Sequence, residues 1–174
     1  MLHLLLCLSI MQSSILVLFD SNQINPSKNW KTVNDGVMGG KSEGDFELTE
    51  ENLIHFKGSI SLRNNGGFSS LRYLLNTSDV SKYKKIRLTI LGDGKQYQFR
   101  IKNKENPNFS YITYFDAKQE VIEIELSEMY PSFRGRKLNL ENFSGGTLTE
   151  IGFLFGNKKE ESFSLKIQKI ELLE

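Results

Sequence analysis

The chain has 174 residues, with 22 basic and 21 acidic side chains and a formal net charge of +1 at pH 7. This balance gives no electrostatic reason to expect a nucleic acid or an anionic membrane as partner. The single cysteine excludes a disulfide within these residues and a zinc site built from thiolates. A chain of this length is sufficient for one domain with its own hydrophobic core.

The first residues are strongly apolar. Residues 1–14 fit either a secretory signal peptide or a segment upstream of a true start at Met11. No Lys or Arg precedes the apolar run and no Ala-x-Ala-like cleavage site follows it, so we expect a cytoplasmic protein, with export to the periplasm as the alternative. Polar residues at positions 12–14 interrupt the run of about 20 apolar residues that a membrane span needs, so stable membrane insertion is not expected. Residues 15–174 are expected to form a single domain.

The next segment, residues 30–42, contains glycine at positions 36, 39 and 40. Glycine accommodates positive φ angles and close approach of other groups, so this composition predicts a shaped loop instead of a helix or strand. We predict that Gly39 or Gly40 has a positive φ, and that the loop folds back under Trp30. A tryptophan beside such a loop is a large anchor and a candidate binding residue.

That arrangement would set Asp35 and Met38 beside a second loop, which contains Asn64, Asn65 and Phe68 with two glycines between them. Asparagine and glycine both tolerate left-handed backbone, so this second loop is predicted to be a tight turn between strands. An alternative is that its two amides and its aromatic ring line a polyol pocket. Together the two loops would form one rim of the domain.

Apolar and polar residues alternate through most of the chain, which is the pattern of half-buried strands. The alternating segments are 54–62, 86–90, 97–101, 111–115, 122–126, 151–155 and 163–172. No run of ten or more residues has helical spacing, and at most residues 79–83 and 127–130 form single helical turns. We therefore predict an all-β domain, a jelly-roll β-sandwich.

Two details of the strands are also predicted. The turn residues Gly92-Asp93-Gly94 lie between two alternating segments, which favours a β-hairpin joining them. The last segment begins in one phase and restarts in the other between Ile167 and Ile170. A phase slip of this kind indicates a β-bulge.

Basic and aromatic side chains gather near residue 133. Arg134, Arg136 and Lys137 follow closely on Tyr130 and Phe133. Arginine forks beside aromatic faces bind carboxylates, sugars or protein partners. The alternative is a surface loop whose side-chain stems pack over the edge of the sandwich.

The residues 40–42, Gly-Lys-Ser, resemble the end of a phosphate-binding P-loop. The pattern requires a glycine where Asp35 stands, and a helix after the serine, which the following residues do not predict. Nucleotide binding is therefore not expected here.

No catalytic apparatus is recognisable. The two histidines, His3 and His55, do not belong to a serine or cysteine motif, so a nucleophilic triad is not expected. Glu123 and Glu125 share one face of a strand, which could suit a glycosidase pair, but solvated surface carboxylates are the simpler interpretation. We expect no enzyme activity, no cofactor and no metal site.

The loops and several strands resemble the complex I intermediate-associated protein 30 family, in the form of a stand-alone bacterial-type member. The matching stretches are Trp30 with residues 34–42, then 56–68, 92–100, 131–136 and 151–155. The resemblance implies a galactose-binding-like jelly-roll sandwich. It also implies a role like that of the mitochondrial members, which assist assembly of respiratory complex I as chaperone-like factors and not as enzymes.

From these observations we expect a non-catalytic interaction module that holds a protein partner. The alternative is a carbohydrate-binding module, because the same sandwich commonly carries sugars. The candidate binding residues are Trp30, Asp35, Met38, Asn64, Asn65, Phe68, Arg100, Tyr130, Arg134 and Arg136.

Overall fold

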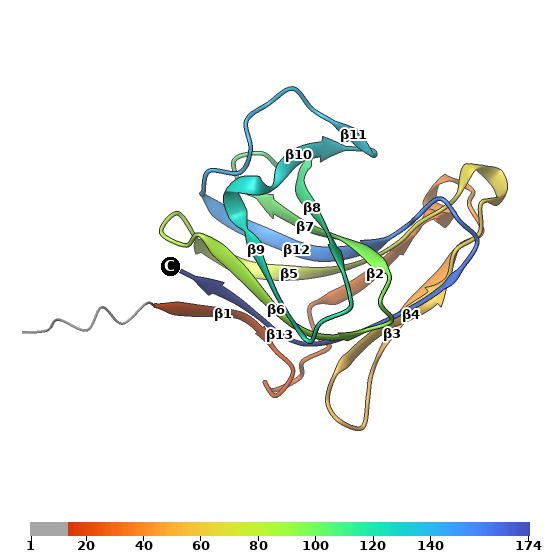
Figure 1. Cartoon of the computed structure of the whole chain (residues 1–174), viewed down its shortest axis with the longest axis horizontal. Helices are drawn as coiled ribbons and strands as arrows, with labels where there is room; N and C mark the ends of the chain where they lie inside the picture. The colour runs from red at the N-terminus through yellow and green to blue at the C-terminus, as the bar shows by residue number, and fades with distance from the viewer. Residues whose placement is uncertain (1–13) are drawn as a thin grey trace, which may run out of the picture.

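Two antiparallel sheets packed face to face make up residues 14–174, the part of the chain that the computed structural model describes, apart from the side chains at positions 77 and 78 (Figure 1). The interpretations of residues 1–13, as a signal peptide or as a segment before Met11, fall outside the described residues. The prediction of an all-β jelly-roll sandwich is confirmed, since the described residues contain strands and three short 3-10 helices but no α-helix.

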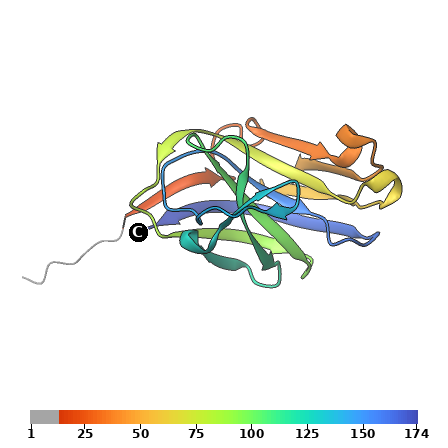
Figure 2. The ribbon, with the colours of Figure 1, turned by 90° about the horizontal axis from the view of Figure 1, so that it is seen from above.

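Sheet A has the order β3-β4-β13-β6-β9, with β1 added beside β13. Its strands are β1 (Ile15–Asp20), β3 (Glu43–Leu48), β4 (Ile54–Ser59), β6 (Lys85–Gly92), β9 (Val121–Glu125) and β13 (Ser162–Leu173). Because β1 pairs with the last residues of β13, the start of the described chain and its C-terminus lie side by side (Figure 2).

Sheet B has the order β11-β10-β8-β7-β12-β5-β2. Its strands are β2 (Trp30–Asn34), β5 (Ser69–Asp79), β7 (Gln96–Asn103), β8 (Ser110–Asp116), β10 (Tyr130–Phe133), β11 (Arg136–Lys137) and β12 (Thr147–Phe155). The 3-10 helices are η1 (Asp35–Met38), η2 (Arg63–Asn65) and η3 (Leu126–Glu128). Sheet B curves around its outer face, and β10 and β11 rise at one side of that face (Figure 1).

The predicted bulge in the last strand is confirmed. The register of β13 against β6 shifts between Ile167 and Lys169. On the other edge of β13, its first half pairs with β4 and its second half pairs with β1. The bulge therefore lies where β13 changes partner, and it turns the apolar side chains of both halves inward.

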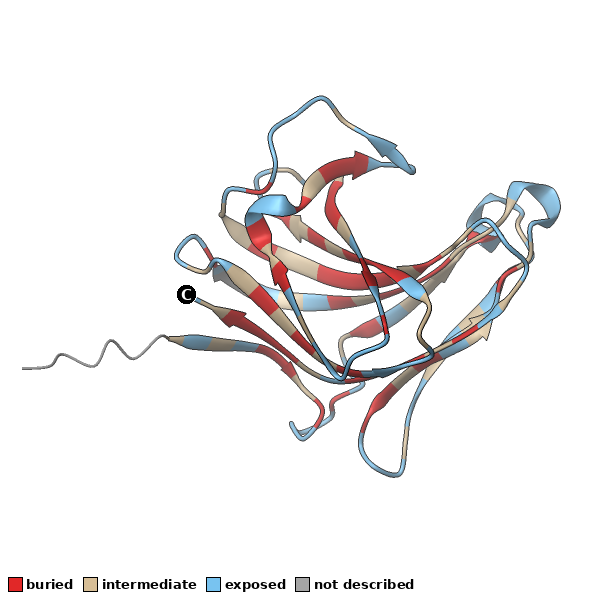
Figure 3. Ribbon diagram, in the orientation of Figure 1, coloured by how far each residue is buried: buried red, intermediate tan, exposed pale blue. Residues whose placement is uncertain are grey.

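The core fills the space between the sheets, and buried residues alternate with less buried ones along strands such as β6 (Figure 3). Trp30 belongs to this core. It is 6 % exposed and its ring lies 5.1 Å from that of Phe19 and 4.8 Å from that of Tyr73. The prediction that the glycine loop folds under Trp30 is therefore wrong, because Trp30 begins β2 and the loop follows the other end of that strand.

The predicted hairpin at Gly92-Asp93-Gly94 is also wrong. Both edges of β6 are occupied, by β13 and β9, so the chain leaves sheet A after Gly92 and enters sheet B as β7. The turn is held by the following loop: the backbone N–H of Gly94 donates to the carbonyl of Ala117 at 3.0 Å, and Ala117 donates to Lys95 at 2.9 Å.

Leu62, which the alternation placed in the core, is 43 % exposed. The reason is that β4 ends at Ser59 and the chain then enters η2, where strand alternation no longer applies. Within residues 14–174, no helix has the length and apolar character required to cross a membrane.

Candidate functional site

The loop after β2 is organised around the fully buried carboxylate of Asp35. This carboxylate accepts hydrogen bonds from the backbone N–H groups of Ser42 at 3.0 Å, Gly67 at 2.6 Å and Phe68 at 3.2 Å. The Ser42 hydroxyl also donates to it. One side chain therefore joins the loop around η1 to the loop around η2.

The backbone of both loops has the predicted character. Gly39 has φ 88°, which confirms a positive φ at one of the two glycines, and Asn64 and Asn65 have φ 56° and 59°. The Asn64 amide donates to the carbonyl of Gly39 at 3.1 Å. The prediction that Asp35 lies beside the turn at residues 64–68 is confirmed, while Met38 is 59 % exposed at the end of η1.

Burial alone would raise the pKa of Asp35. The hydrogen bonds from Ser42, Gly67 and Phe68 outweigh burial and hold the pKa below its ordinary value. The carboxylate is therefore ionised at neutral pH, and its lone pairs are occupied by the loops it joins. Its contacts are those of a structural centre.

A polar pocket of about 600 Å³ lies on the solvent side of this centre. It is lined by Gly40, Lys41, Ser42, Glu43, Ser59, Ser61, Arg63 and Asn64. A ligand in this pocket would meet Lys41, Arg63 and Asn64, whereas Asp35 lies behind them.

Arg100 and Tyr130 lie elsewhere, on the outer face of sheet B. The registers of the neighbouring strands place a single row of residues across this face: Lys31, Arg72, Gly152, Arg100, Ile112 and Tyr130. Gly152 has no side chain to separate the two arginines, and the Cγ atom of Arg72 lies 3.6 Å from the position that a Cβ atom on Gly152 would occupy. Pairing between strands far apart in the sequence thus brings Arg72 next to Arg100.

Neutral side chains hold the guanidinium group of Arg100. It donates to the Gln98 side-chain oxygen at 2.7 Å and to the Ser110 hydroxyl at 3.3 Å. The Gln98 amide in turn donates to the hydroxyl of Tyr114 at 2.9 Å. Burial, and then the neighbouring Tyr114, raise the pKa of Tyr130. Arginine, glutamine and two tyrosines therefore form one connected polar and aromatic group.

Within residues 14–174, no carboxylate forms an ion pair with Arg72 or Arg100. Burial is the main reason why the pKa of Arg100 lies below its usual value, and Arg72 lowers it further, while Glu150 and Tyr114 act in the opposite direction. The charged form of Arg100 is thus held in surroundings that do not neutralise it.

The remaining basic and aromatic candidates form the β10–β11 hairpin. Arg134 and Gly135 have φ 48° and 75°, the left-handed pair of a two-residue hairpin turn. The guanidinium group of Arg134 lies 5.4 Å from the centre of the Phe133 ring. Arg134 and Arg136 are exposed, and they occupy the tip of the hairpin.

The predicted site residues therefore fall into four places: the core (Trp30), the paired loops (Asp35, Met38, Asn64, Asn65 and Phe68), the outer face of sheet B (Arg100 and Tyr130) and the hairpin tip (Arg134 and Arg136). Sequence reasoning did not include Arg72, Gln98 and Tyr114 among the candidate binding residues. The alternation pattern indicated part of this group, since Arg72 and Arg100 each stand between two large apolar residues and so point outward. Their common row depends on strand register.

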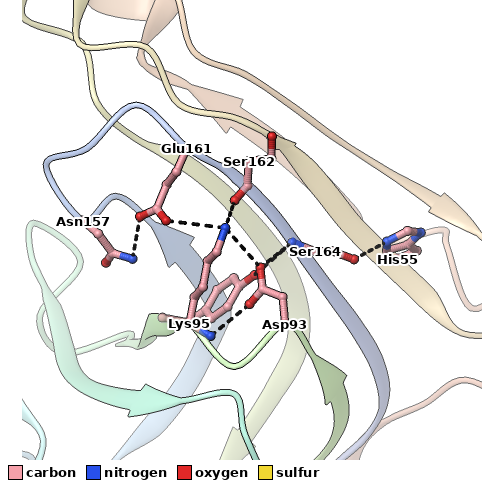
Figure 4. Close-up of polar contacts among 8 residues, drawn as sticks. His55, Asp93, Lys95, Asn157, Glu161, Ser162 and Ser164 are labelled. Atoms are coloured by element: carbon pink, nitrogen blue, oxygen red, sulfur yellow. Dashed lines mark hydrogen bonds and ion pairs between the residues drawn. The ribbon is translucent and has the colours of Figure 1, made fainter.

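His55 has neighbours that its sequence context did not predict. Its Nδ1 atom lies 3.4 Å from the carboxylate of Glu47, and its Nε2 atom lies 2.8 Å from the hydroxyl of Ser164 (Figure 4 shows the serine contact). A pocket of about 620 Å³ borders His55 and Ser164. Glu47 also forms an ion pair with Lys57 at 2.6 Å.

These contacts lack the donors that acyl transfer requires. The backbone N–H of Ser164 donates to the Asp93 carboxylate at 2.9 Å and to the Tyr97 hydroxyl at 3.1 Å, so it is not free to stabilise an oxyanion (Figure 4). Ser164 also lies inside a regular strand, β13. We interpret the group as cross-strand hydrogen bonding that fastens β3, β4 and β13 together.

Glu123 and Glu125 are surface residues of sheet A. Glu125 forms an ion pair with Lys85 at 2.9 Å, and Glu123 forms one with Arg87 at 2.8 Å. Among the described residues, no group of three or more His, Cys, Asp or Glu side chains has an arrangement that could hold a metal ion.

Comparison with known proteins identifies the family. The sequence model of complex I intermediate-associated protein 30 matches residues 17–167, nearly the whole described chain. The chain belongs to the complex I intermediate-associated protein 30 family. No curated protein matched the sequence.

Several solved structures similar to this family member are carbohydrate-binding modules. The family 11 module from Clostridium thermocellum, in complex with a β-1,3-1,4-mixed-linked tetrasaccharide, has a TM-score of 0.61 at 20 % identity, covering 91 % of this chain and 94 % of that chain. The family 11 module of a cellulosomal cellulase of the same organism has 0.62 at 18 %, covering 94 % and 95 %. A low-affinity xylan-binding module from Roseburia intestinalis has 0.51 at 13 %, covering 94 % and 96 %. At these identities the likeness establishes the galactose-binding-like sandwich fold alone.

Proposed function

We propose that this family member is a non-catalytic binding module that holds a protein partner on the outer face of sheet B. The observation that carries the proposal is the connected group on that face, in which Arg100 is held by Gln98 and Gln98 by Tyr114. Binding groups fixed by their neighbours lose little conformational entropy when a partner arrives. Arginine and tyrosine are also the residue types that most often dominate binding energy at protein interfaces.

The family supports a protein as the partner, by analogy with an assembly factor that holds a subunit. A glycan is the second candidate, and one observation favours it. Tyr114 is 50 % exposed on this face, and Tyr130 lies close to it. Aromatic rings beside arginine and amide groups suit sugar rings, and the solved structures of similar fold named above are carbohydrate-binding modules.

The test is affinity capture from the native cells, run beside a glycan array, with wild type and Tyr114→Ala. Val121→Ala is the matched control, because Val121 is 47 % exposed on β9 of the other sheet. We expect Tyr114→Ala to lose the retained protein or glycan while its melting temperature stays near that of wild type. A partner retained equally by Tyr114→Ala would overturn the proposal, and the nature of the retained molecule separates the two candidates.

We also propose a cytoplasmic location, on the interpretation that translation starts at Met11. Protein purified from its own cells is then expected to begin at Met11 or Gln12. A mature N-terminus near Ser13 or Ser14 in an exported fraction would instead establish the signal-peptide interpretation.

A further inference from the structure

The outer faces of the two sheets differ in how many of their basic side chains form ion pairs. On sheet A, three cations form ion pairs, Lys57 with Glu47 at 2.6 Å, Lys85 with Glu125 at 2.9 Å, and Arg87 with Glu123 at 2.8 Å, while Lys166 of β13 forms no ion pair with any residue from 14 to 174. On sheet B, strand register and alternation place Lys31, Arg72, Arg100 and Lys102 on the outer face, with Glu150 as the neighbouring carboxylate. None of these five residues forms an ion pair within the described part of the chain.

Arg100 is the most fully described of these unpaired cations. Its hydrogen bonds go to two neutral oxygens, those of Gln98 and Ser110, and a guanidinium group has more N–H donors than these occupy. The next residue of its row on β8, Ile112, is buried although it lies outside the core between the sheets. A cation removed from water without a counter-charge is costly, and an arriving anion offsets that cost.

We infer that this face recognises an acidic segment of a protein partner, with an Asp or Glu carboxylate bridging the guanidinium groups of Arg72 and Arg100. The inference rests on the proposed function and names the chemistry of its partner. Guanidinium groups match the planar geometry of a carboxylate and bind it through paired N–H donors. Across Gly152 the two arginines are neighbours in one row, so a single carboxylate can reach both.

A peptide is favoured over an acidic glycan because the arginines have aliphatic neighbours. Leu74, the next outward residue after Arg72 on β5, is 56 % exposed. Val33 and Leu154 are half-buried and lie in the adjacent row, opposite Ser70. Apolar side chains of a peptide can cover such surface, whereas sugar rings stack mainly on aromatic faces. Arginine and tyrosine are enriched in protein interfaces, and the buried centre of an interface is more apolar than its rim.

The experiment measures binding of a short labelled peptide of alternating glutamate and leucine to the full chain by fluorescence polarisation. A peptide with glutamine in place of glutamate removes only the charge. Arg72→Gln is the principal variant, and Arg72→Lys keeps the charge but not the planar guanidinium group. Lys118→Gln is the control, since Lys118 is exposed just after β8 and is already paired with Asp116. Competition with oligogalacturonate tests whether the carboxylate that binds this face comes from an acidic glycan instead of a peptide.

We expect the glutamate peptide to bind, with an affinity that falls as salt is raised. Loss of one charged contact should weaken it about tenfold or more in Arg72→Gln, with an intermediate loss in Arg72→Lys and no change in Lys118→Gln. No binding, equal binding of the glutamine peptide, unchanged affinity in Arg72→Gln, or binding of oligogalacturonate without the peptide would each overturn the inference. If the cellular partner is lost by Tyr114→Ala and retained by Arg72→Gln, the inference fails and the proposed function stands. Retention by both variants overturns the proposed function itself.

Discussion

The carboxylate of Asp35 accepts a hydrogen bond at 2.6 Å from the backbone N–H of Gly67, which lies 32 positions further along the chain. The same carboxylate accepts a second backbone hydrogen bond from Phe68 and a third from Ser42. The loop that follows β2 and the loop that precedes β5 are therefore one unit. Its stability depends on an ionised group that faces inward.

Replacing Asp35 by Asn tests this unit. The side chain keeps its shape, but an NH₂ group replaces one accepting oxygen and faces backbone donors. We expect a loss of about 2–3 kcal/mol in the free energy of unfolding, because a hydrogen bond to a charged group contributes about 1.5–3 kcal/mol. Urea unfolding followed by the fluorescence of the single tryptophan measures the loss. Asp116→Asn, at an exposed carboxylate, is the control, and equal unfolding midpoints for the two variants would contradict the structural role.

The pH dependence of the same variant has a defined sign. Folding lowers the pKa of Asp35 from its ordinary value, so its contribution to stability is full above the unfolded-state pKa and is lost as the pH falls through the folded-state pKa. The stability difference between wild type and Asp35→Asn should be constant from about pH 7 to about pH 5, and should shrink below about pH 4, where the unfolded carboxyl titrates. Urea unfolding at stepped pH measures it. A difference that persists undiminished at the lowest pH would mean that the charge of Asp35 is not its source.

The glycines of the loop should differ sharply in their tolerance of alanine. A Cβ atom on Gly40 would overlap the Asp35 carboxylate, whereas one on Gly36 would have nothing within 4 Å. We expect Gly40→Ala to cost about 1–3 kcal/mol, the usual range for overpacking. Gly36→Ala should be close to neutral, and thermal unfolding compares the two. Equal melting temperatures would show that the loop relaxes around the added methyl group.

Trp30 should tolerate phenylalanine better than alanine. Its ring packs against Phe19, Tyr73 and Phe153, and its indole N–H has no hydrogen-bond partner among the described residues. Trp30→Ala should therefore cost about 3–5 kcal/mol as a core truncation. Trp30→Phe keeps most of the packing and sacrifices no hydrogen bond, so it should cost clearly less. Chemical denaturation followed by circular dichroism gives both values, and a phenylalanine variant as unstable as the alanine variant would contradict this account.

Ser164 should be unreactive towards fluorophosphonates in spite of its contact with His55. The reason is that its backbone N–H is bonded to Asp93 and cannot stabilise the charge that develops during attack. Mass spectrometry of the treated protein tests this expectation. Covalent labelling at Ser164 that disappears in His55→Gln would contradict it and would point to a catalytic role for the group.

The class of fold and several local features of this protein could be predicted from its amino-acid sequence. Alternation of apolar and polar residues indicates strands because successive side chains of a strand point to opposite faces. The phase slip between Ile167 and Ile170 predicted the bulge of β13, since one extra residue reverses the alternation. The positive φ of Gly39 was likewise predictable, because it depends on the conformational freedom of glycine in its own loop.

Which strands are neighbours could not be predicted in this way, because strand pairing depends on the tertiary structure. The turn at Gly92 has the composition of a hairpin, yet β6 and β7 lie in different sheets because β13 and β9 occupy both edges of β6. The meeting of Asp35 with Gly67, and of Arg72 with Arg100 across Gly152, depends on pairing between segments that are distant in the chain. The alternation around Arg72 and Arg100 shows that both side chains point outward. Which residue lies beside each of them is set by strand register, and register is fixed only when all the strands bury their apolar faces together.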